Sequence, residues 1–560
     1  MTIEEAYRLW CEKATKDEKV VEELKSMEGN EALIEDAFYK NLEFGTGGLR
    51  GVIGAGSNRM NIYTVAKASQ GLADYVYKNF EGGNRSIAVS YDSRINSDVF
   101  AKVAAGVFAA NGVKVFIYRE LMPTPCLSYA VRALGCSAGI MVTASHNPSK
   151  YNGYKVYGYD GCQITTIMAN MILAEIENTD IFEDVKWGDF DEYLAEGKIK
   201  YIEEEVYTAF TEEVKKQSLL GDEKIDKNVA IVYTPLNGTG LKPVTRALKE
   251  SGYSNITLVS EQEKPDGNFP TCPYPNPEIK EAMSLGMEYA KKNNADLLLA
   301  TDPDCDRVGI AVKNDKGEYV LLSGNQTGCL LLDYVCSRRV AMNAMPGNAV
   351  MVKTIVTADM AERIADHYGV KTVNVLTGFK FIGEQIGQLE AEGRETDYIM
   401  GFEESYGYLS GSYVRDKDAV NGAFLICEMF AYYKTKGISL LDKLNELYNT
   451  YGFSLNTLHS YEFEGSAGFE KMQEIMAGFR AGLTEIGGSK VEKYLDYKTG
   501  IDNLPPSDVL KFYLEGGHSV VVRPSGTEPK LKLYLSITAA DENQATEFEK
   551  SLVKELESHL

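Results

Sequence analysis

The chain has 560 residues, of which 58 are basic and 81 acidic, and its net charge is −23. A surface this acidic argues against a nucleic-acid partner, because such binding depends on Lys and Arg side chains at phosphates, yet it allows a local basic pocket for a small anion. The hydrophobic share of 44% and charged share of 25% are typical of a globular protein with a sizeable core.

The first 40 residues predict amphipathic helices of mixed charge, and alternation of short apolar runs with longer helical segments follows. The runs are Ile87–Ser90, Lys114–Ile117, Ala138–Val142, Val229–Tyr233, Asp296–Ala300, Ala349–Lys353 and Tyr398–Gly401. This alternation predicts α/β units with parallel or mixed sheets. The last hundred residues predict an α+β unit: a helix at 469–486, strands at 519–523 and 530–537, and a terminal helix from Glu542.

A chain of this length predicts about four domains. The acidic stretch 178–205 and the punctuated segments at 448–455 and 504–508 suit boundaries. We expect a helical extension at 1–40, α/β modules at 41–205, 206–323 and 324–450, and an α+β domain at 451–560.

A dense polar segment, T-A-S-H-N-P, follows the third apolar run. The nucleophile elbow of α/β hydrolases needs glycine two places before and two places after its serine; Thr143 and Asn147 stand there, so this interpretation fails for Ser145. In an extended loop His146 would point away from Ser145 and would be a poor base for it. A plain turn is the alternative, since Asn and Pro favour turns.

Three aspartates, Asp302, Asp304 and Asp306, alternate directly after a strand-like run. Carboxylates this close tolerate one another when a hard cation lies between them, and oxygen ligands suit Mg²⁺ or Ca²⁺. An EF-hand is excluded because Arg307 and Lys313 occupy its glycine and glutamate positions. We expect Mg²⁺ with positions left for a phosphate oxygen; the alternative is a solvated acidic turn.

Two further loops carry other polar groups. F-G-T-G-G-L-R-G lacks the G-x-G-x-x-G spacing and a predicted strand before it, so the dinucleotide interpretation fails. Its Arg50 can still approach a phosphate, or the segment is a flexible connector. In M-G-F-E-E-S-Y-G-Y, Glu403 and Ser405 share one side of an extended loop and suit sugar hydroxyls; a strand-end turn is the alternative.

The loop V-V-R-P-S-G-T-E-P-K offers a guanidinium fork, two hydroxyls and a permissive backbone, which suit a phosphate dianion better than a plain hairpin does. These groups belong to Arg523, Ser525, Gly526 and Thr527. Lys353 and Lys380, considered alone, are solvated surface charges.

The nine cysteines form no C-x-x-C pair, and the five histidines lie far apart. Irregularly spaced cysteines are typical of reduced thiols in a cytoplasmic protein, and zinc is not expected. No apolar run of 18 residues and no signal peptide are present, so no membrane partner is expected. The oligomeric state is open.

Together, the loops resemble the signature loops of the α-D-phosphohexomutase (phosphoglucomutase/phosphomannomutase) superfamily. T-A-S-H-N-P, D-P-D-C-D-R, G-F-E-E-S-Y-G and R-P-S-G-T-E-P-K occur in the family order and spacing, one in each predicted domain, and the resemblance covers about residues 40–560. The extension and the F-E-E-S-Y-G loop are most similar to the branch of bacterial phosphoglucomutases and phosphopentomutase-like enzymes. The implied architecture is three similar α/β modules with mixed sheets and a C-terminal α+β domain around a central cleft.

The resemblance implies that Ser145 is carried as a phosphoserine. It implies that Asp302, Asp304 and Asp306, with the phosphoryl oxygen on Ser145, bind Mg²⁺. Proton handling is implied for His146 and Lys155, with Arg50 assisting. The implied substrate contacts are Arg307, Lys353, Thr377, Gly378, Lys380, Glu403, Ser405, Arg523, Ser525, Gly526 and Thr527.

The implied activity is an intramolecular phosphotransfer, classed as an isomerisation, between glucose 1-phosphate and glucose 6-phosphate. Glucose 1,6-bisphosphate is the implied intermediate and activator. Phosphomannomutases commonly carry G-E-x-S-G-H, whereas residues 403–408 here lack histidine, so mannose tolerance is not implied; phosphomannomutase and phosphopentomutase activities remain alternatives. A phosphatase with a phosphoserine intermediate and a non-catalytic sugar-phosphate regulator are the rivals from other classes.

Overall fold

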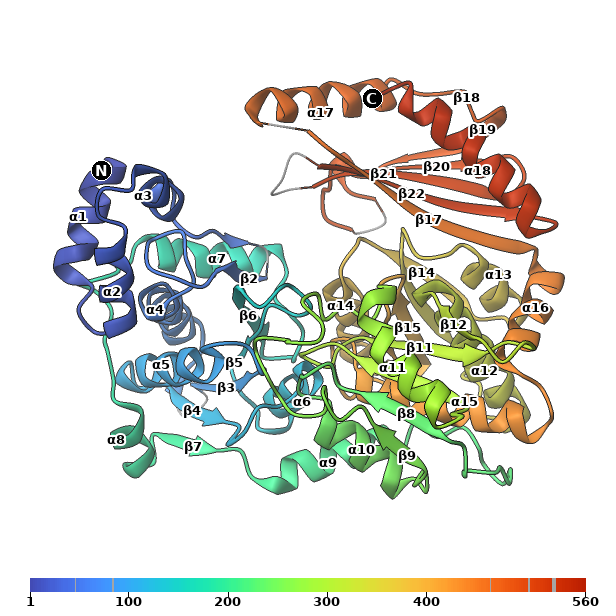
Figure 1. Cartoon of the computed structure of the whole chain (residues 1–560), viewed down its shortest axis with the longest axis horizontal. Coiled ribbons are helices and arrows are strands. Elements are labelled where there is room, and N and C mark those ends of the chain that lie inside the picture. Colours follow the sequence, from blue (N-terminus) through green and yellow to red (C-terminus); the bar gives the residue numbers. More distant parts are fainter. Residues whose placement is uncertain (46, 83–84, 464, 502–503, 526–529) are drawn as a thin grey trace.

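The computed structural model describes residues 1–560 except 46, 83–84, 464, 502–503 and 526–529 (Figure 1). In this described part, the strands form four sheets that follow one another along the chain. The first three sheets mix parallel and antiparallel pairs and carry helices, and the fourth is antiparallel. The predicted class, α/β modules with mixed sheets followed by an α+β unit, is confirmed. None of the described helices is both long and apolar enough to cross a membrane.

The N-terminal extension forms three helices that pack on the first α/β unit. They are α1 (Ile3–Lys13), α2 (Glu18–Ser26) and α3 (Glu31–Phe38). Trp10 of α1 is 3% exposed, and its ring makes edge contacts with those of Phe38, Tyr63 and Phe182. Because Tyr63 and Phe182 belong to the first unit, the extension shares one apolar core with it.

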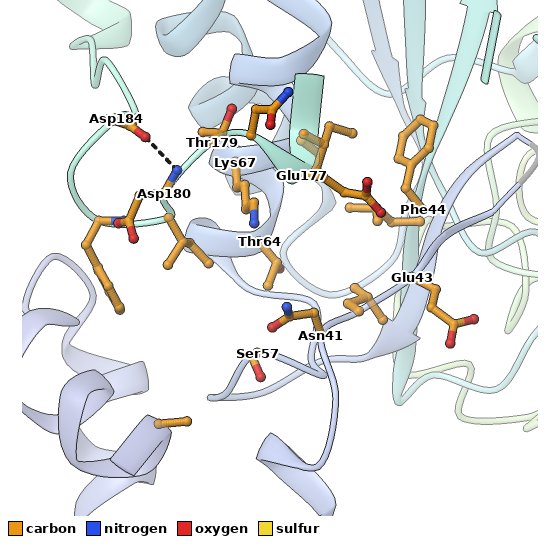
Figure 2. Close-up of a pocket in the computed structure, with 18 of the residues that line it drawn as sticks. Asn41, Glu43, Phe44, Ser57, Thr64, Lys67, Glu177, Thr179, Asp180 and Asp184 are labelled. Carbon is orange, nitrogen blue, oxygen red and sulfur yellow. Dashed lines mark hydrogen bonds between the residues drawn. The ribbon is translucent and has the colours of Figure 1, made fainter. Parts of the chain in front are cut away.

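A cavity of about 670 Å³ lies between the extension and the first unit (Figure 2). Leu9 and Trp10 of α1 line one side, and Lys67 and Ile176 line the other. Figure 2 shows the Lys67 side chain among the labelled lining residues, near Thr64 and Thr179. The lining includes none of the residues of the polar loops around Ser145, Asp302, Glu403 and Arg523.

The first sheet has the order β1-β2-β6-β5-β3-β4-β7. Its strands are β1 (Phe44–Gly45), β2 (Gly48–Val52), β3 (Ser86–Tyr91), β4 (Lys114–Ile117), β5 (Ala138–Val142), β6 (Tyr151–Gly158) and β7 (Ile199–Tyr201). Its helices are α4 (Ile62–Asn79), α5 (Ser97–Ala110), α6 (Thr124–Ala133), α7 (Thr166–Glu177) and α8 (Phe190–Ala195). Every residue of β5 is buried, which explains its unbroken apolar run.

The second sheet has the order β12-β11-β10-β8-β9, and the third β14-β13-β15-β16. The strands are β8 (Ile231–Thr234), β9 (Ile256–Leu258), β10 (Leu297–Thr301), β11 (Val308–Lys313), β12 (Tyr319–Leu322), β13 (Val350–Thr354), β14 (Lys371–Val375), β15 (Tyr398–Glu403) and β16 (Gly407–Leu409). The helices are α9 (Glu204–Lys215), α10 (Leu241–Glu250), α11 (Lys280–Lys292), α12 (Gly324–Ala341), α13 (Met360–His367), α14 (Phe379–Ala391), α15 (Ala419–Thr435) and α16 (Leu440–Tyr451). One apolar core extends through both units.

The fourth sheet has the order β17-β22-β21-β20-β19-β18. Its elements are β17 (Phe453–Glu462), α17 (Gly465–Arg480), β18 (Glu485–Ile486), β19 (Ser489–Asp496), β20 (Leu510–Leu514), β21 (His518–Pro524), β22 (Lys530–Ala539) and α18 (Glu542–Glu557). The helix expected to reach residue 486 ends at Arg480, so this boundary is wrong. Gly482 has φ 94°, a conformation that ends helices, and the next apolar residues form β18.

The polar loops found in the sequence follow the ends of central strands. Ser145 comes after β5, Asp302 directly after β10, Glu403 ends β15, and Arg523 lies at the end of β21. Parallel pairing of β3 with β5, β8 with β10 and β13 with β15 places the first three loops at carboxyl ends of sheets. Such edges are where α/β proteins hold their ligands.

Candidate functional site

The serine loop, residues 143–149, brings Ser145 and His146 together. Ser145 has φ 54°, in the left-handed region, and its Oγ lies 3.2 Å from Nδ1 of His146. The expectation that an extended loop would separate these two side chains is wrong, because the left-handed turn rotates them toward each other. The same hydroxyl donates a hydrogen bond of 3.1 Å to Oδ2 of Asp302 from the second unit.

Three carboxylates meet next to Ser145. Asp302, Asp304 and Asp306 are fully buried, and one oxygen of each lies within 4.8 Å of the others. Among the described residues, Oδ1 of Asp304 and Oδ1 of Asp306 are buried without a hydrogen-bond partner, whereas Oδ2 of Asp306 is ion-paired with Lys417 at 3.0 Å. Buried carboxylate oxygens need a partner, so this donor set fits a hard, oxygen-loving cation.

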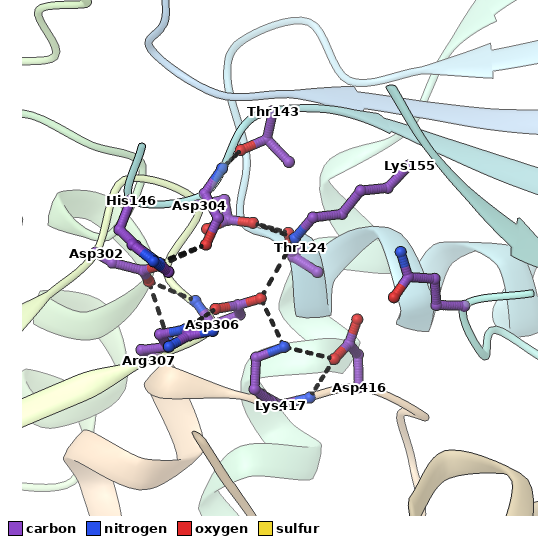
Figure 3. Close-up of polar contacts among 12 residues, drawn as sticks. Thr124, Thr143, His146, Lys155, Asp302, Asp304, Asp306, Arg307, Asp416 and Lys417 are labelled. Atoms are coloured by element: carbon purple, nitrogen blue, oxygen red, sulfur yellow. Dashed lines mark hydrogen bonds and ion pairs between the residues drawn. The ribbon is translucent and has the colours of Figure 1, made fainter. Parts of the chain in front are cut away.

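Cationic side chains from three units surround the aspartates (Figure 3). Nζ of Lys155, from β6, lies 2.8 Å from Oδ2 of Asp304 and 3.5 Å from Oδ2 of Asp306. Nζ of Lys417, which precedes α15, lies 3.0 Å from Oδ2 of Asp306. Arg307 pairs with Glu278 at 2.6 Å. The cluster therefore joins the first three units by charge pairs.

These charges set the protonation of the site. Burial, then Arg307 and Arg50, hold the pKa of His146 well below its usual range, so its imidazole is neutral at pH 7. Burial opposes the charge of Lys155, but the neighbouring aspartates outweigh it and raise the lysine pKa. Burial, then Asp306 and Asp304, raise the pKa of Asp302 well above its usual range. A neutral imidazole thus lies beside the Ser145 hydroxyl, and Lys155 stays charged on Asp304.

The loop after β15 is a tight turn, and the expected extended loop is not present. Residues 404–406 connect β15 to β16, and Glu403 pairs with Gly407 across the turn. Glu403 is 5% exposed; burial raises its pKa to about 7, although Lys417 opposes the shift. Glu404 accepts hydrogen bonds from Thr354 and Thr357 instead. Of the two glutamates, Glu403 is therefore the one whose pKa is affected by the charge of Lys417.

The loop after β21 is only partly described. Arg523 pairs with Lys532 in the sheet, and the amide of Ser525 donates to the Lys530 carbonyl at 2.7 Å. Gly526 and Thr527 lie outside the described residues. Burial and then the charge of Glu404 raise the pKa of Tyr534, whereas Arg523 lowers it. The Arg523 and Glu403 loops are therefore within electrostatic reach of the same tyrosine.

The remaining predicted contacts lie in the third unit. Lys353 is fully buried, with Nζ 3.1 Å from the Thr357 carbonyl and 3.0 Å from Oε1 of Glu362. The interpretation of Lys353 as a solvated surface charge is therefore wrong. Lys380 is half-buried, and burial lowers its pKa. Thr377 has a buried hydroxyl without a partner among the described residues, and Gly378, with φ 118°, precedes α14.

Arg50 lies on a β-hairpin edge. The glycine-rich segment forms β1 and β2, so the alternative of a flexible connector is wrong. Gly48 has φ 137°, and a Cβ there would lie 1.9 Å from the Tyr154 carbonyl, which only glycine avoids. Arg50 pairs in register with Gly153. Burial, then the charge of Arg307, lowers the pKa of Arg50, whereas Asp304 and Asp306 oppose the shift, so Arg50 is within electrostatic reach of the aspartates.

Sequence analysis missed four residues of this cluster. Lys417 and Asp416 belong to V-R-D-K-D, which precedes α15, and Oδ2 of Asp416 accepts from the Tyr157 hydroxyl at 2.7 Å. Thr124 donates to Oδ2 of Asp304 at 2.9 Å, and Glu278 pairs with Arg307. The charged run directly before an apolar helix could have indicated Lys417. No sequence pattern singles out Thr124 or Glu278.

Comparison with known proteins covers nearly the whole chain. The family models phosphoglucomutase/phosphomannomutase alpha/beta/alpha domains I, II and III match residues 41–182, 208–317 and 323–451, and the C-terminal domain model matches 470–555. A phosphoglucomutase of Staphylococcus saprophyticus is 36% identical over 544 residues, covering 92% of this chain and 96% of the relative. A phosphoglucomutase of Staphylococcus aureus is 38% identical over 524 residues, covering 90% and 91%.

Two solved structures share the fold. Paramecium parafusin, a phosphoglucomutase in an open form, has a TM-score of 0.70 at 18% identity, covering 93% of this chain and 94% of that one. A phosphoglucomutase/phosphomannomutase family protein of Burkholderia thailandensis has a TM-score of 0.68 at 18% identity, covering 92% and 97%.

Proposed function

Because the chain belongs to the phosphoglucomutase/phosphomannomutase family, we propose that it is a phosphoglucomutase. It interconverts glucose 1-phosphate and glucose 6-phosphate by intramolecular phosphotransfer. Ser145 carries the phosphoryl group, and glucose 1,6-bisphosphate is the intermediate and the activator. Curated phosphoglucomutases at 36–38% identity over most of the chain support this choice of substrate.

One observation carries the proposal: the Ser145 hydroxyl lies 3.1 Å from Asp302, within a buried triad of aspartates. An acyl-transfer serine would need hydrogen-bond donors for an oxyanion, whereas this hydroxyl donates to a carboxylate of a buried aspartate cluster. A phosphoryl group on this oxygen would meet Lys155 and Arg307 as counter-charges. The setting therefore suits a phosphoserine.

Asp302, Asp304 and Asp306 would hold Mg²⁺ together with a phosphoryl oxygen of Ser145. The buried Oδ1 atoms of Asp304 and Asp306, which have no hydrogen-bond partner, support this assignment. When bound, the cation would neutralise charge that builds up on the phosphoryl oxygens during transfer. Lys155 stays on the other oxygen of Asp304 and adds a fixed positive charge.

Protons move through the side chains beside Ser145. In the first transfer the bond between phosphorus and the Ser145 Oγ breaks, and a bond forms to the free hydroxyl of the sugar phosphate. Neutral His146 accepts the proton of that hydroxyl, while Lys155 remains protonated and stabilises the Ser145 oxygen. Arg50 assists as a cation. The bisphosphate then turns round; in the second transfer a bond forms from phosphorus to the Ser145 oxygen, the bond from phosphorus to the sugar oxygen breaks, and His146 returns its proton to that sugar oxygen.

The other loops bind the part of the substrate that does not react. Glu403 and Ser405 contact sugar hydroxyls, and Arg307 links this loop to the aspartates by a 3.2 Å hydrogen bond to the Ser405 carbonyl. The non-reacting phosphate is held by a donor-rich loop. Its residues are Arg523, Ser525, Gly526 and Thr527. The remaining contacts near sugar and phosphate are Lys353, Thr377, Gly378 and Lys380.

The raised pKa of Glu403 predicts a pH dependence. Glu403 must be ionised to accept sugar hydroxyls, so kcat/KM should rise with pH through about 7. Glu403→Gln should lower kcat/KM by about 10²-fold at pH 8 and remove this rise. Because the folded pKa lies above the unfolded value near 4.3, this group also makes the free energy of unfolding fall as pH rises between the two. Initial rates measured from pH 5.5 to 8.5 test the expected rise of kcat/KM. If Glu403→Gln shows the same rise, the rise belongs to a group other than Glu403.

Phosphorus NMR tests the activity itself. Purified protein with Mg²⁺ receives glucose 1-phosphate, mannose 1-phosphate or ribose 1-phosphate, each with a trace of its bisphosphate. We expect fast conversion of the glucose ester. Faster conversion of the ribose or mannose ester would move the activity to a phosphopentomutase or a phosphomannomutase, and release of free phosphate without any isomer would contradict the mutase proposal.

A further inference from the structure

A single buried arginine holds the backbone of the serine loop. Nη2 of Arg94 donates to the carbonyl of Ser145 at 2.5 Å and to that of Asn147. Nη1 donates to the carbonyls of Pro148 and Tyr151, each at 3.0 Å. The Arg94 side chain has no solvent exposure. One guanidinium thus donates to four carbonyls that face the protein interior. No other type of side chain has enough donors for four such bonds.

A second set of contacts holds the loop from its beginning. Asp92 lies 3.4 Å from Nε of Arg94, and its Oδ2 accepts a 2.6 Å hydrogen bond from the Thr143 hydroxyl. Oγ1 of Thr143 in turn accepts from the amide of Ser145 at 2.8 Å. The amide and the carbonyl of Ser145 are therefore both fixed. A left-handed conformation is unfavourable for serine and persists only where its surroundings hold it in this way.

The second unit covers this arrangement. The Phe269 ring centroid lies 5.1 Å from the Arg94 guanidinium. Gly267 packs so closely that a Cβ there would lie 2.5 Å from the amide nitrogen of Ile95. Water is thereby kept from the hydrogen bonds beneath the loop, which strengthens them.

We infer that Arg94, with Asp92 and Thr143, is a positioning residue for Ser145. None of the three touches the reacting oxygen. They hold Ser145 in the left-handed turn that places its Oγ against Asp302 and His146. The expected effect on kcat rests on the proposed function, whereas the role of Arg94 in holding the serine loop does not depend on it. A misplacement of about 1 Å is enough to cost about 10²-fold in rate.

The test compares Arg94→Lys with a matched variant. Lysine keeps the charge but lacks the planar fork that reaches several carbonyls. Arg338 is also buried, at 4% exposure, and donates to the carbonyls of Leu219 and Leu220, while Tyr432 lies against it. Arg338→Lys therefore removes a similar carbonyl clamp away from the serine loop. Equal losses of Tm would show that the two variants are equally destabilised.

We expect Arg94→Lys to lower kcat by about 10²-fold with KM changed less than about threefold, and Arg338→Lys to leave both nearly unchanged. Hydrogen exchange of residues 143–151 should become at least about tenfold faster in Arg94→Lys alone. Exchange in that segment equal to the wild type, or equal kinetic losses in both lysine variants, would overturn the inference. If the wild type fails to isomerise glucose 1-phosphate, the proposed function fails, and the exchange data still decide the positioning role.

A second pair keeps the inference falsifiable if Arg94→Lys does not fold. Thr143→Val removes the oxygen that joins Asp92 to the Ser145 amide, whereas Thr143→Ser retains it. We expect the kcat of Thr143→Ser to exceed that of Thr143→Val by about tenfold or more. Hydrogen exchange of residues 143–151 should also be slower in Thr143→Ser than in Thr143→Val. Equal kcat and equal exchange in the two variants would contradict the inference.

Discussion

Replacing Ser145 with alanine should abolish isomerisation, with a fall in kcat of at least about 10⁴-fold. The hydroxyl that lies 3.1 Å from Asp302 is the proposed phosphoryl carrier, and alanine has no oxygen to form the covalent bond. Coupled measurement of glucose 6-phosphate from glucose 1-phosphate gives the rate. Intact mass after incubation with glucose 1,6-bisphosphate shows whether the protein gains a phosphoryl group.

Ser149 provides the matched control because it belongs to the same loop and is half-buried. Ser149→Ala should retain the wild-type rate and the phosphorylated mass. If Ser145→Ala retained more than about one-hundredth of the wild-type rate, Ser145 would not be the phosphoryl carrier, whatever the rate of Ser149→Ala.

Removal of the divalent cation should have the second large effect. Three buried carboxylates repel one another, and burial with this repulsion raises the pKa of Asp302. We expect chelation to lower activity by at least about 10³-fold and Mg²⁺ to restore it. Bound Mg²⁺ at 100 times its Kd should also stabilise the fold by about 2.7 kcal/mol, measured as a rise in Tm.

Asp306→Asn should weaken Mg²⁺ binding in calorimetry, since it removes a charge from the buried triad and Oδ1 of Asp306 has no hydrogen-bond partner in the described structure. Asp315→Asn, in the exposed turn between β11 and β12, is the control and should bind Mg²⁺ as the wild type does. Full activity after exhaustive chelation, or equal Mg²⁺ affinity in the two variants, would show that the aspartates serve another purpose.

Ser145 is held in place by residues that do not contact the reacting oxygen. The hydrogen bonds from Arg94 end on backbone carbonyls, and a sequence pattern contains no information about which carbonyls face inward. Lys353 shows a related limit: considered alone it predicts a solvated charge, yet it is buried and its ammonium lies between the Thr357 carbonyl and Glu362. Lys511 of the fourth unit bonds the neighbouring Asp359 at 2.9 Å, so this cluster links the third and fourth units.

The sequence by itself determined the α/β class, most central strands and the family. Strands buried on both faces must be apolar throughout, which makes runs such as Ala138–Val142 visible. The residues that carry the proposed chemistry, Ser145 and the aspartates at 302–306, were visible because they belong to polar loops that follow such runs.

Only the tertiary structure decided how these residues meet. Lys417 reaches Asp306 from another unit, and the left-handed turn at Ser145 brings His146 to its side, which reverses the expectation for an extended loop. Local patterns report periodicity and turn preference, whereas contacts between distant segments depend on how complete units pack. The protonation of His146 and Glu403 follows from the same packing, because burial and the charges of other units shift their pKa values.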